Sequence, residues 1–175
     1  MADNEIGAAL RRAQAVYGQR PGAAVHADSA AVARWEGGLR VVTSHPSGRS
    51  VTSDMPTEFG GSGEQITPGW YARAGTAACA ATCIAIAAQL RGIALTSLEV
   101  TVESRSDARG VLGMLAADGT AVEAGATDYR LRVALAGEAA EADLQALALD
   151  GCRCSPIGRS MARANNLEVQ IEITR

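Results

Sequence analysis

The sequence predicts an α+β domain with antiparallel sheets, and three patterns lead to that class. Short β-prone runs gather between residues 30 and 55, one long apolar run covers 68–91, and two alternating runs lie at 95–105 and 128–137. A chain of 175 residues is the size of one domain with a buried core. Because 47% of the residues are hydrophobic and only 3% are aromatic, this core must be packed from Ala, Val, Leu and Ile.

The chain opens with a predicted amphipathic helix. Between Asp3 and Tyr17 the apolar residues follow a 3.6-residue period, which is typical of a helix with one apolar face. Gly18 and Pro21 come directly afterwards and supply the stop.

Three short strands are expected next. The runs 31–36, 39–44 and 50–55 are rich in Val and Thr, and they are separated by Gly37-Gly38 and by a His-Pro-Ser-Gly turn. This order predicts a three-stranded antiparallel meander. A polar, glycine-rich loop follows it.

The long apolar run predicts the central helix of the fold. Thr67 and Pro68 are typical N-cap and first-turn residues, Arg91 is the last helical residue, and Gly92 is a typical end. The helix would be roughly 35 Å long and apolar on nearly every side, whereas one sheet covers only one side. Small residues along it let another backbone approach closely. We therefore expect a second copy of the chain to supply the missing cover.

Two strands, each with one solvent-exposed face, are expected after the helix. The runs 95–105 and 128–137 alternate apolar with polar or small residues. Residues 107–125 between them predict a strand extension and a loop. The last expected elements are two short helices and a closing strand, at 138–149, 155–164 and 167–175.

Charge and composition exclude several classes of function. The formal net charge is −3 and both signs are mixed along the chain, so neither a nucleic acid nor an anionic membrane is an expected partner. The stretch 74–90 is mostly alanine and includes Thr76 and Thr82, which argues against a membrane span. Residues 1–20 lack the basic-then-apolar order of a secretory signal. We therefore expect a cytoplasmic protein.

Four cysteines are the candidate reactive groups. In a reducing compartment they are free thiols, redox centres or metal ligands rather than structural disulfides. Cys79 and Cys83 are four residues apart and share one face of the long helix. On that spacing alone packing is the first interpretation, because a free cysteine packs as a compact hydrophobe. Zinc ligation with Cys152 and Cys154 is the second, but these spacings do not match zinc fingers or ribbons.

A redox role is the third interpretation. A thiol reacts with peroxide as the thiolate, and apolar burial raises its pKa, so a reactive Cys79 needs a cation beside it. Arginine suits this task because it stays charged and its planar fork can also bind a carboxylate. Glu58 in the glycine-rich loop could orient such an arginine. The candidate arginines on the predicted meander are Arg34, Arg40 and Arg49.

Several motifs surround Cys79 at characteristic spacings. They are, in chain order, PTEFGG at 56–61, TP at 67–68 leading to AAC at 77–79, RGI at 91–93 and LTSLEV at 95–100. Through them the chain from residue 30 to 175 resembles the OsmC/Ohr family of thiol-dependent hydroperoxide reductases. Residues 1–29 would then be an N-terminal helical extension and residues 30–175 the OsmC-like domain.

The resemblance implies an intertwined homodimer in which antiparallel sheets enclose two long helices, in agreement with the cover argument. It also implies that Cys79 is a peroxidatic thiolate, which becomes a sulfenic acid as it reduces an organic hydroperoxide to an alcohol. Glu58 would orient an arginine against the sulfur, and a second cysteine would form a disulfide that a dithiol reductant reopens. The chemistry needs no metal and no bound cofactor.

The sequence departs from the family pattern at two positions. The family's second cysteine precedes a proline, whereas here Ser155 precedes Pro156 and Cys154 is one residue earlier. Cys154 is therefore the candidate second thiol, and Cys152 is a poorer one. The family's arginine lies in the turn between the first two strands, where Arg40 is the nearest match.

The changed second-cysteine position leaves an alternative open, which is a non-catalytic OsmC-like dimer whose apolar pocket binds a small ligand. Cys83 has no counterpart in the family pattern and is interpreted as packing. Phe59 and Trp70 flank the expected mouth of the site, where an apolar wall would favour organic hydroperoxides over hydrogen peroxide.

Overall fold

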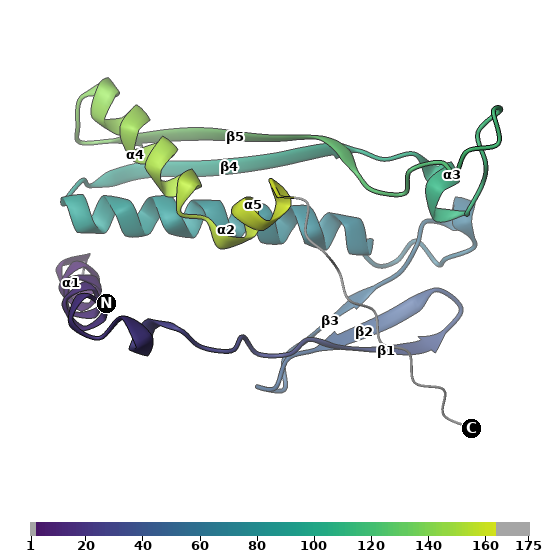
Figure 1. The fold of residues 1–175 in the computed structure, drawn as a ribbon, viewed down its shortest axis with the longest axis horizontal. Helices are drawn as coiled ribbons and strands as arrows, with labels where there is room; N and C mark the ends of the chain where they lie inside the picture. Colours follow the sequence, from purple (N-terminus) through teal and green to yellow (C-terminus); the bar gives the residue numbers. More distant parts are fainter. Residues whose placement is uncertain (1–2, 164–175) are drawn as a thin grey trace.

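A computed structural model describes residues 3–163 and shows two antiparallel sheets around one long helix (Figure 1). The predicted closing strand at 167–175 lies outside the described residues. The elements in order are α1 (Asp3–Gln19), η1 (Pro21–Ala24), β1 (Val32–Gly37), β2 (Arg40–Ser44), β3 (Ser50–Ser53), η2 (Thr57–Phe59), α2 (Pro68–Arg91), β4 (Leu95–Arg105), α3 (Ala108–Val111), β5 (Thr127–Gly137), α4 (Glu141–Arg153) and α5 (Pro156–Met161). The predicted α+β class is confirmed.

The first sheet is the predicted three-stranded meander in the order β1-β2-β3. Trp35 pairs with Val41, and Val41 pairs with Ser53 in the antiparallel register. Gly37 and Gly38 have φ angles of 110° and 54°, which explains why the turn between the first two strands needs glycine.

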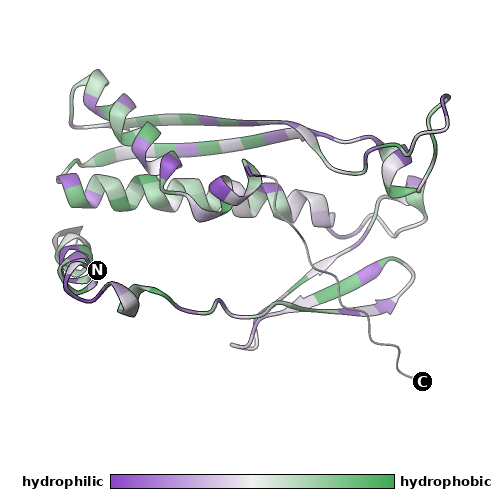
Figure 2. Ribbon diagram, in the orientation of Figure 1, coloured by the Kyte–Doolittle hydropathy of each residue, from purple (hydrophilic) through white to green (hydrophobic). Residues whose placement is uncertain are grey.

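The second sheet is the antiparallel pair β4 and β5, which packs on α2. Val100 pairs with Val133, and apolar residues alternate with polar ones along both strands (Figure 2). The segment between the strands, expected to be a strand extension and a loop, forms the short helix α3 and an isolated bridge between Leu115 and Ala121. Helix α3 begins here because the Asp107 side chain accepts a hydrogen bond from the Arg109 backbone at 3.0 Å.

Helix α2 begins and ends where the sequence predicts. The Thr67 side chain accepts a hydrogen bond from the Trp70 backbone at 3.3 Å, and Gly92 adopts a left-handed conformation with φ of 69° at the other end. The Tyr71 hydroxyl donates to the Thr52 carbonyl oxygen at 3.0 Å and so ties the first turns of α2 to β3. These contacts fix the position of the thiols along the helix.

Among residues 3–163, only one stripe of α2 is fully buried. Its buried residues recur every four positions, and they are Thr76, Ala80, Ile84 and Ala88. Ile84 and Ala88 form the central core cluster together with Leu147 of α4. By length and composition alone α2 could also span a membrane, and 22% of its most apolar window is buried inside the chain.

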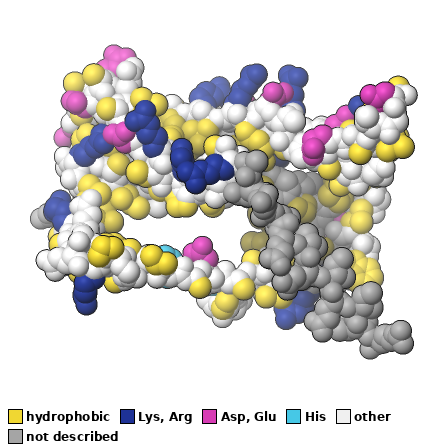
Figure 3. Space-filling view, in the orientation of Figure 1, with side chains coloured by type: hydrophobic (Ala, Val, Ile, Leu, Met, Phe, Trp, Pro, Cys, Tyr) yellow, Lys and Arg dark blue, Asp and Glu magenta, His cyan; other side chains and the backbone are white. Residues whose placement is uncertain are grey.

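The meander and the α1–β1 connection form a separate lower layer (Figure 1). An opening separates this layer from α2 in the space-filling view (Figure 3). Helix α1 packs directly against α2, because a Cβ on the buried Gly7 would lie 3.2 Å from the Gln89 carbonyl oxygen. Among residues 3–163, much of the apolar surface of α2 is therefore only partly covered.

Candidate thiol site

Two helices bring four cysteines to one region of the molecule. Helix α2 carries Cys79 and Cys83 one turn apart on the same face. The last turn of α4 carries Cys152, and Cys154 is the residue that caps this helix. The first three are half-buried, and Cys154 is exposed. Cys83 Sγ donates a hydrogen bond to the Cys154 carbonyl oxygen over 3.5 Å, which joins the two helices directly at the thiols.

Cys83 lies at the centre of this group. Its pKa is raised first by burial, then by the charge of Cys79 and by a hydrogen bond between the two side chains, and finally by the charges of Cys154 and Cys152. Burial also raises the pKa of Cys152. Both thiols therefore hold their protons more firmly than a free cysteine does. The sequence pattern favours a packing role for Cys83, although its spacing of four from Cys79 puts the two cysteines on one face of the helix.

The chain beyond α4 runs antiparallel along α2. At one end Cys154 contacts Cys83, and at the other Ile157 lies 3.8 Å from the position of a Cβ on Gly75. Cys79 is midway between these two contacts in the helix sequence. Cys154 is thus level with Cys83, about one helical turn of 5.4 Å beyond Cys79.

Ser155 has a structural task in this segment. Its side chain is 1% exposed and accepts a hydrogen bond from the Gly158 backbone at 3.2 Å, so it is the N-cap of α5. The family resemblance assigns a cysteine to this position. In this chain a buried serine stands there instead, and the neighbouring Cys154 is an exposed residue.

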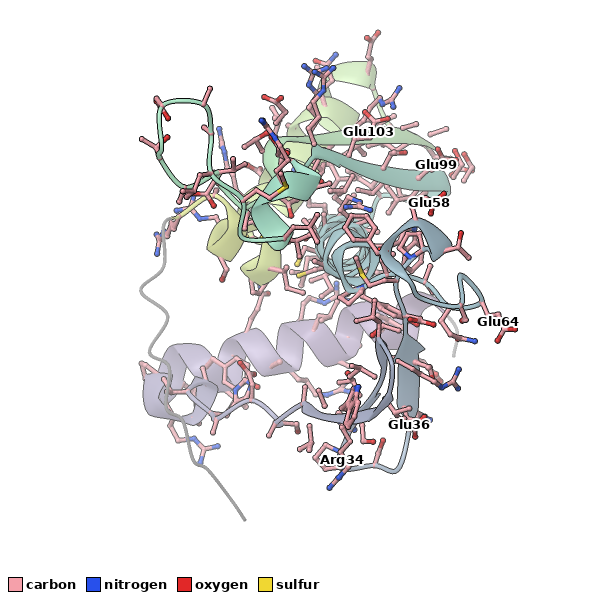
Figure 4. The ribbon with its side chains drawn as sticks, turned by 90° about the vertical axis from the view of Figure 1, so that its right-hand side faces the viewer. Arg34, Glu36, Glu58, Glu64, Glu99 and Glu103 are labelled. Atoms are coloured by element: carbon pink, nitrogen blue, oxygen red, sulfur yellow. The ribbon has the colours of Figure 1, made fainter. Side chains whose placement is uncertain are left out.

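Arg40 and Glu58 lie on different elements and have different surroundings. Arg40 on β2 donates to Glu36 at 3.2 Å. Glu58 is an exposed residue of η2. In Figure 4, which looks along α2, Glu58 lies beside that helix, whereas Arg34 and Glu36 lie at the lower edge of the molecule. Among the salt bridges of residues 3–163, none involves Glu58.

Asp54 organises the loop that carries Glu58. It is 4% exposed and accepts hydrogen bonds from the Met55 backbone at 2.7 Å and from the Ser62 backbone and hydroxyl at 2.9 and 2.7 Å. The bonds from Ser62, then that from Met55, and the charge of Arg40 lower the pKa of Asp54. A Cβ on Gly61 would lie 1.9 Å from the Met55 carbonyl oxygen, so the loop closes only with glycine there. No sequence pattern had pointed to Asp54.

Two pockets lie beside the candidate site residues, one at the Asp54 loop and one at Cys152. One, of about 320 Å³, lies between the β1–β2 turn and the glycine-rich loop and includes Arg40, Asp54 and Gly61 in its lining. The other, of about 720 Å³, is an apolar groove between β5, α4 and α5, with Cys152 on its wall. Within residues 3–163, no three His, Cys, Asp or Glu side chains are grouped so that they could hold a metal ion.

Comparisons with known proteins agree with this architecture. A family model described as OsmC-like protein matches residues 61–171, which is more than half of the chain. A comparison with curated proteins found no match.

Several solved structures share the fold. An OsmC-like protein from Mycoplasma pneumoniae has a TM-score of 0.60 at 15% identity, with 79% of this chain and 89% of that chain covered. An organic hydroperoxide resistance protein from Legionella pneumophila has a TM-score of 0.52 at 23% identity, with 78% and 90% covered. Another such protein, from Elizabethkingia anophelis, has a TM-score of 0.53 at 16% identity, with 79% and 90% covered. At these identities the likeness establishes the fold.

Proposed function

The chain belongs to the OsmC-like protein family, and from that premise we propose that it is a thiol-dependent peroxidase that reduces organic hydroperoxides to alcohols. The observation that carries the proposal is a half-buried Cys79 on the central helix, with a second half-buried thiol, Cys83, one helical turn away on the same face. Relatives of the same fold described as organic hydroperoxide resistance proteins support the choice of substrate class.

The reaction begins at the sulfur of Cys79. The thiolate attacks the distal oxygen of the hydroperoxide, the O–O bond breaks, and the alkoxide takes up a proton and leaves as an alcohol. Cys79 is left as a sulfenic acid, oxidised by two electrons. A second thiol condenses with it to a disulfide and releases water, and an external dithiol then reduces the disulfide. Cys154 is the second thiol that the sequence predicts.

The thiolate needs a cation, and we propose that a homodimer supplies it. Within one chain Arg40 donates to Glu36, and in the part of the chain that the structure describes only one stripe of α2 is fully buried. A second copy that packs on the open side of α2 would cover its apolar surface and bring Arg40 of the other meander to Cys79. Glu58, presented by the loop around Asp54, would then hold the guanidinium in place through charge-assisted hydrogen bonds.

Thiol counting tests the proposal. Reduced protein mixed with cumene hydroperoxide should lose two thiols per chain and yield one cumyl alcohol for each hydroperoxide consumed. Cys79→Ser should abolish the consumption, whereas Cys152→Ser, which changes a thiol outside the proposed reaction, should leave it near the parent level. Consumption by Cys79→Ser at the parent rate would show the proposal to be wrong. A dimer by light scattering is expected, and a monomer would contradict the proposed source of the cation.

The apolar groove favours one alternative, which is a non-catalytic dimer that binds a small apolar ligand. Its lining is mostly apolar, with Leu131, Val133 and Leu149 among its residues. If this alternative holds, the protein will bind an apolar fluorescent probe such as anilinonaphthalene sulfonate but will consume no cumene hydroperoxide. Leu149→Glu should then abolish probe binding.

A further inference from the structure

We propose that Cys83 is the resolving thiol of this chain: the sulfenic acid formed on Cys79 condenses with Cys83, and the disulfide is then passed to the exposed Cys154. The inference rests on the proposed peroxidase function, because an organic hydroperoxide must first oxidise Cys79. It gives Cys83 a chemical role in place of packing. It also moves Cys154 from the first disulfide to the second.

Cys83 is the neighbour of both Cys79 and Cys154. Cys83 lies one helical turn from Cys79 on the same face of α2, and its thiol donates to the Cys154 carbonyl oxygen at 3.5 Å. The segment after α4 runs antiparallel to α2 and keeps Cys154 level with Cys83 rather than with Cys79. The next residue, Ser155, is buried and has no thiol. The nearest sulfur that the helix itself presents to an oxidised Cys79 is therefore that of Cys83.

Oxidation of Cys79 changes the charge beside Cys83. Burial makes the largest contribution to the raised pKa of Cys83, and the charge of Cys79 comes next. A protonated sulfenic acid carries no charge, so oxidation of the Cys79 thiolate to that form removes the negative neighbour. The pKa of Cys83 then falls, while burial and the charges of Cys154 and Cys152 still hold it above the ordinary value. Cys83 thus becomes a better nucleophile at the moment when its target appears.

The first step balances as a condensation. The Cys83 sulfur gives up its proton and attacks the sulfur of the Cys79 sulfenic acid, so that an S–S bond forms and the S–O bond breaks. The hydroxide that leaves combines with the proton as water. The hydroperoxide has already supplied the two oxidising equivalents.

The second step is a thiol–disulfide exchange with no net oxidation. Cβ atoms four residues apart on a helix are about 5–6 Å apart, whereas a disulfide prefers about 3.5–4.5 Å, so a bond between Cys79 and Cys83 strains α2. Strained disulfides exchange readily. The Cys154 thiolate attacks the Cys83 sulfur, forms the outer disulfide and releases Cys79 as a thiolate for the next turnover. Because Cys154 is exposed, a dithiol reductant can reach this bond.

Trypsin separates the thiols in a way that identifies each disulfide. Cleavage after arginine leaves Cys79 and Cys83 together in peptide 74–91, Cys152 in 133–153, and Cys154 in 154–159. The full-length parent, treated with cumene hydroperoxide and alkylated, should yield a cross-link between peptides 74–91 and 154–159. In Cys154→Ser the relay should stop at the first bond, so peptide 74–91 should carry an internal disulfide and escape alkylation.

Cys83→Ser decides between the relay and direct attack. Without Cys83 the Cys79 sulfenic acid should persist and react with dimedone, and the yield of the 74–91/154–159 cross-link should fall at least about tenfold. Cys83→Ala repeats the test without a hydroxyl, and Cys152→Ala is the matched control that should keep the parent pattern. A cross-link that forms in Cys83→Ser as fast as in the parent would overturn the inference, because Cys154 would then react with Cys79 directly.

Dimedone labelling separates the two proposals. Labelling of Cys79 in each variant shows that the first oxidation still occurs, and urea denaturation shows that the variant is folded. If Cys79 is labelled but Cys83 enters no disulfide in any variant, the relay is wrong and the peroxidase function stands. If the parent's Cys79 acquires neither dimedone nor a disulfide, the proposed function fails and the relay fails with it.

Discussion

Gly151 of α4 lies so close to Ile84 of α2 that a Cβ on the glycine would fall 2.5 Å from Ile84 Cγ1 and 2.6 Å from its Cα. These two residues are the chain neighbours of Cys152 and Cys83. The close approach of the two helix backbones therefore sets the distance between the thiols that each helix carries. The Gly151–Ile84 contact therefore affects both the packing of the two helices and the spacing of their thiols.

Gly151→Ala should destabilise the fold and slow the formation of disulfides between α2 and α4. The added methyl group has no room, so the helices must move apart, at a cost of about 1–3 kcal/mol in the free energy of unfolding. Urea denaturation measures that cost, and the yield of the cross-link between peptides 74–91 and 154–159 measures the effect on the thiols.

Gly18→Ala is the matched control for this substitution. Gly18 lies in α1 with nothing within 4 Å of a Cβ built on it, so alanine should leave stability unchanged or raise it by up to about 1 kcal/mol. If Gly151→Ala proves as stable as Gly18→Ala, the close helix contact does not hold the site together.

Asp54→Asn should loosen the loop that presents Glu58. The carboxylate accepts three hydrogen bonds at its two oxygens, and the amide replaces one of those oxygens with a donor that faces another donor. At neutral pH the variant should be less stable than the parent and should consume cumene hydroperoxide more slowly. Peroxide consumption at the parent rate would mean that the order of this loop does not matter to the reaction.

The effect of Asp54→Asn should also depend on pH, with a sign that the structure fixes. The pKa of Asp54 is lowered in the folded chain from its ordinary value of 3.8. The stabilisation is therefore complete above that value and is lost as the pH falls through the lower, folded-state pKa. The difference in unfolding free energy between parent and variant should shrink below about pH 4. Asp28→Asn is the exposed control: its side chain is 97% exposed and pairs with the exposed His26 at 3.5 Å, so at neutral pH this variant should match the parent's free energy of unfolding within about 0.5 kcal/mol.

The features that could be predicted from the sequence are those set by residues near one another in the chain. Thr67 and Gly92 bound α2 because a cap needs only its own turn. The glycine pair between the first two strands marks the meander for the same reason. The contact of Cys83 with Cys154 spans 71 residues and depends on how α4 crosses α2, which no local pattern encodes.

The loop around Asp54 could not be predicted for the same reason, since its contacts are not local in the sequence. The Asp54 carboxylate and Ser62 are eight residues apart in a loop that has no hydrophobic periodicity, so nothing in the sequence indicates that they meet. For Arg40 the sequence predicts the position but not the contact. The predicted turn places Arg40 correctly at the start of β2, yet within the chain it forms an ion pair with Glu36, four residues earlier. Its role toward Cys79 stays a prediction.

Alkylation should reveal the raised pKa of Cys83. Because the thiolate is the reacting form, Cys83 should react with iodoacetamide more slowly than the exposed Cys154 at pH 7. Cys79→Ser removes a nearby charge and thiol, so the pKa of Cys83 should fall and its alkylation should begin at lower pH. Burial should still hold that pKa above the ordinary value. Mass spectrometry of peptide 74–91 over a pH series measures the shift, and an unchanged profile in Cys79→Ser would show that the two thiols are not coupled.

Ser155→Cys should open a direct route to Cys79 at a cost in stability. Residue 155 is buried in the segment that passes Cys79 on its way from Cys83 to Gly75, so a thiol there should reach the sulfenic acid without Cys83. A cysteine caps a helix poorly, and loss of the bond from Gly158 should cost about 0.5–2 kcal/mol. In a Cys83→Ser background, Ser155→Cys should restore the cross-link between peptides 74–91 and 154–159, whereas Ser155→Ala should lose the same stability and restore nothing. Failure of the cysteine to restore the cross-link would mean that the segment does not hold residue 155 within reach of Cys79.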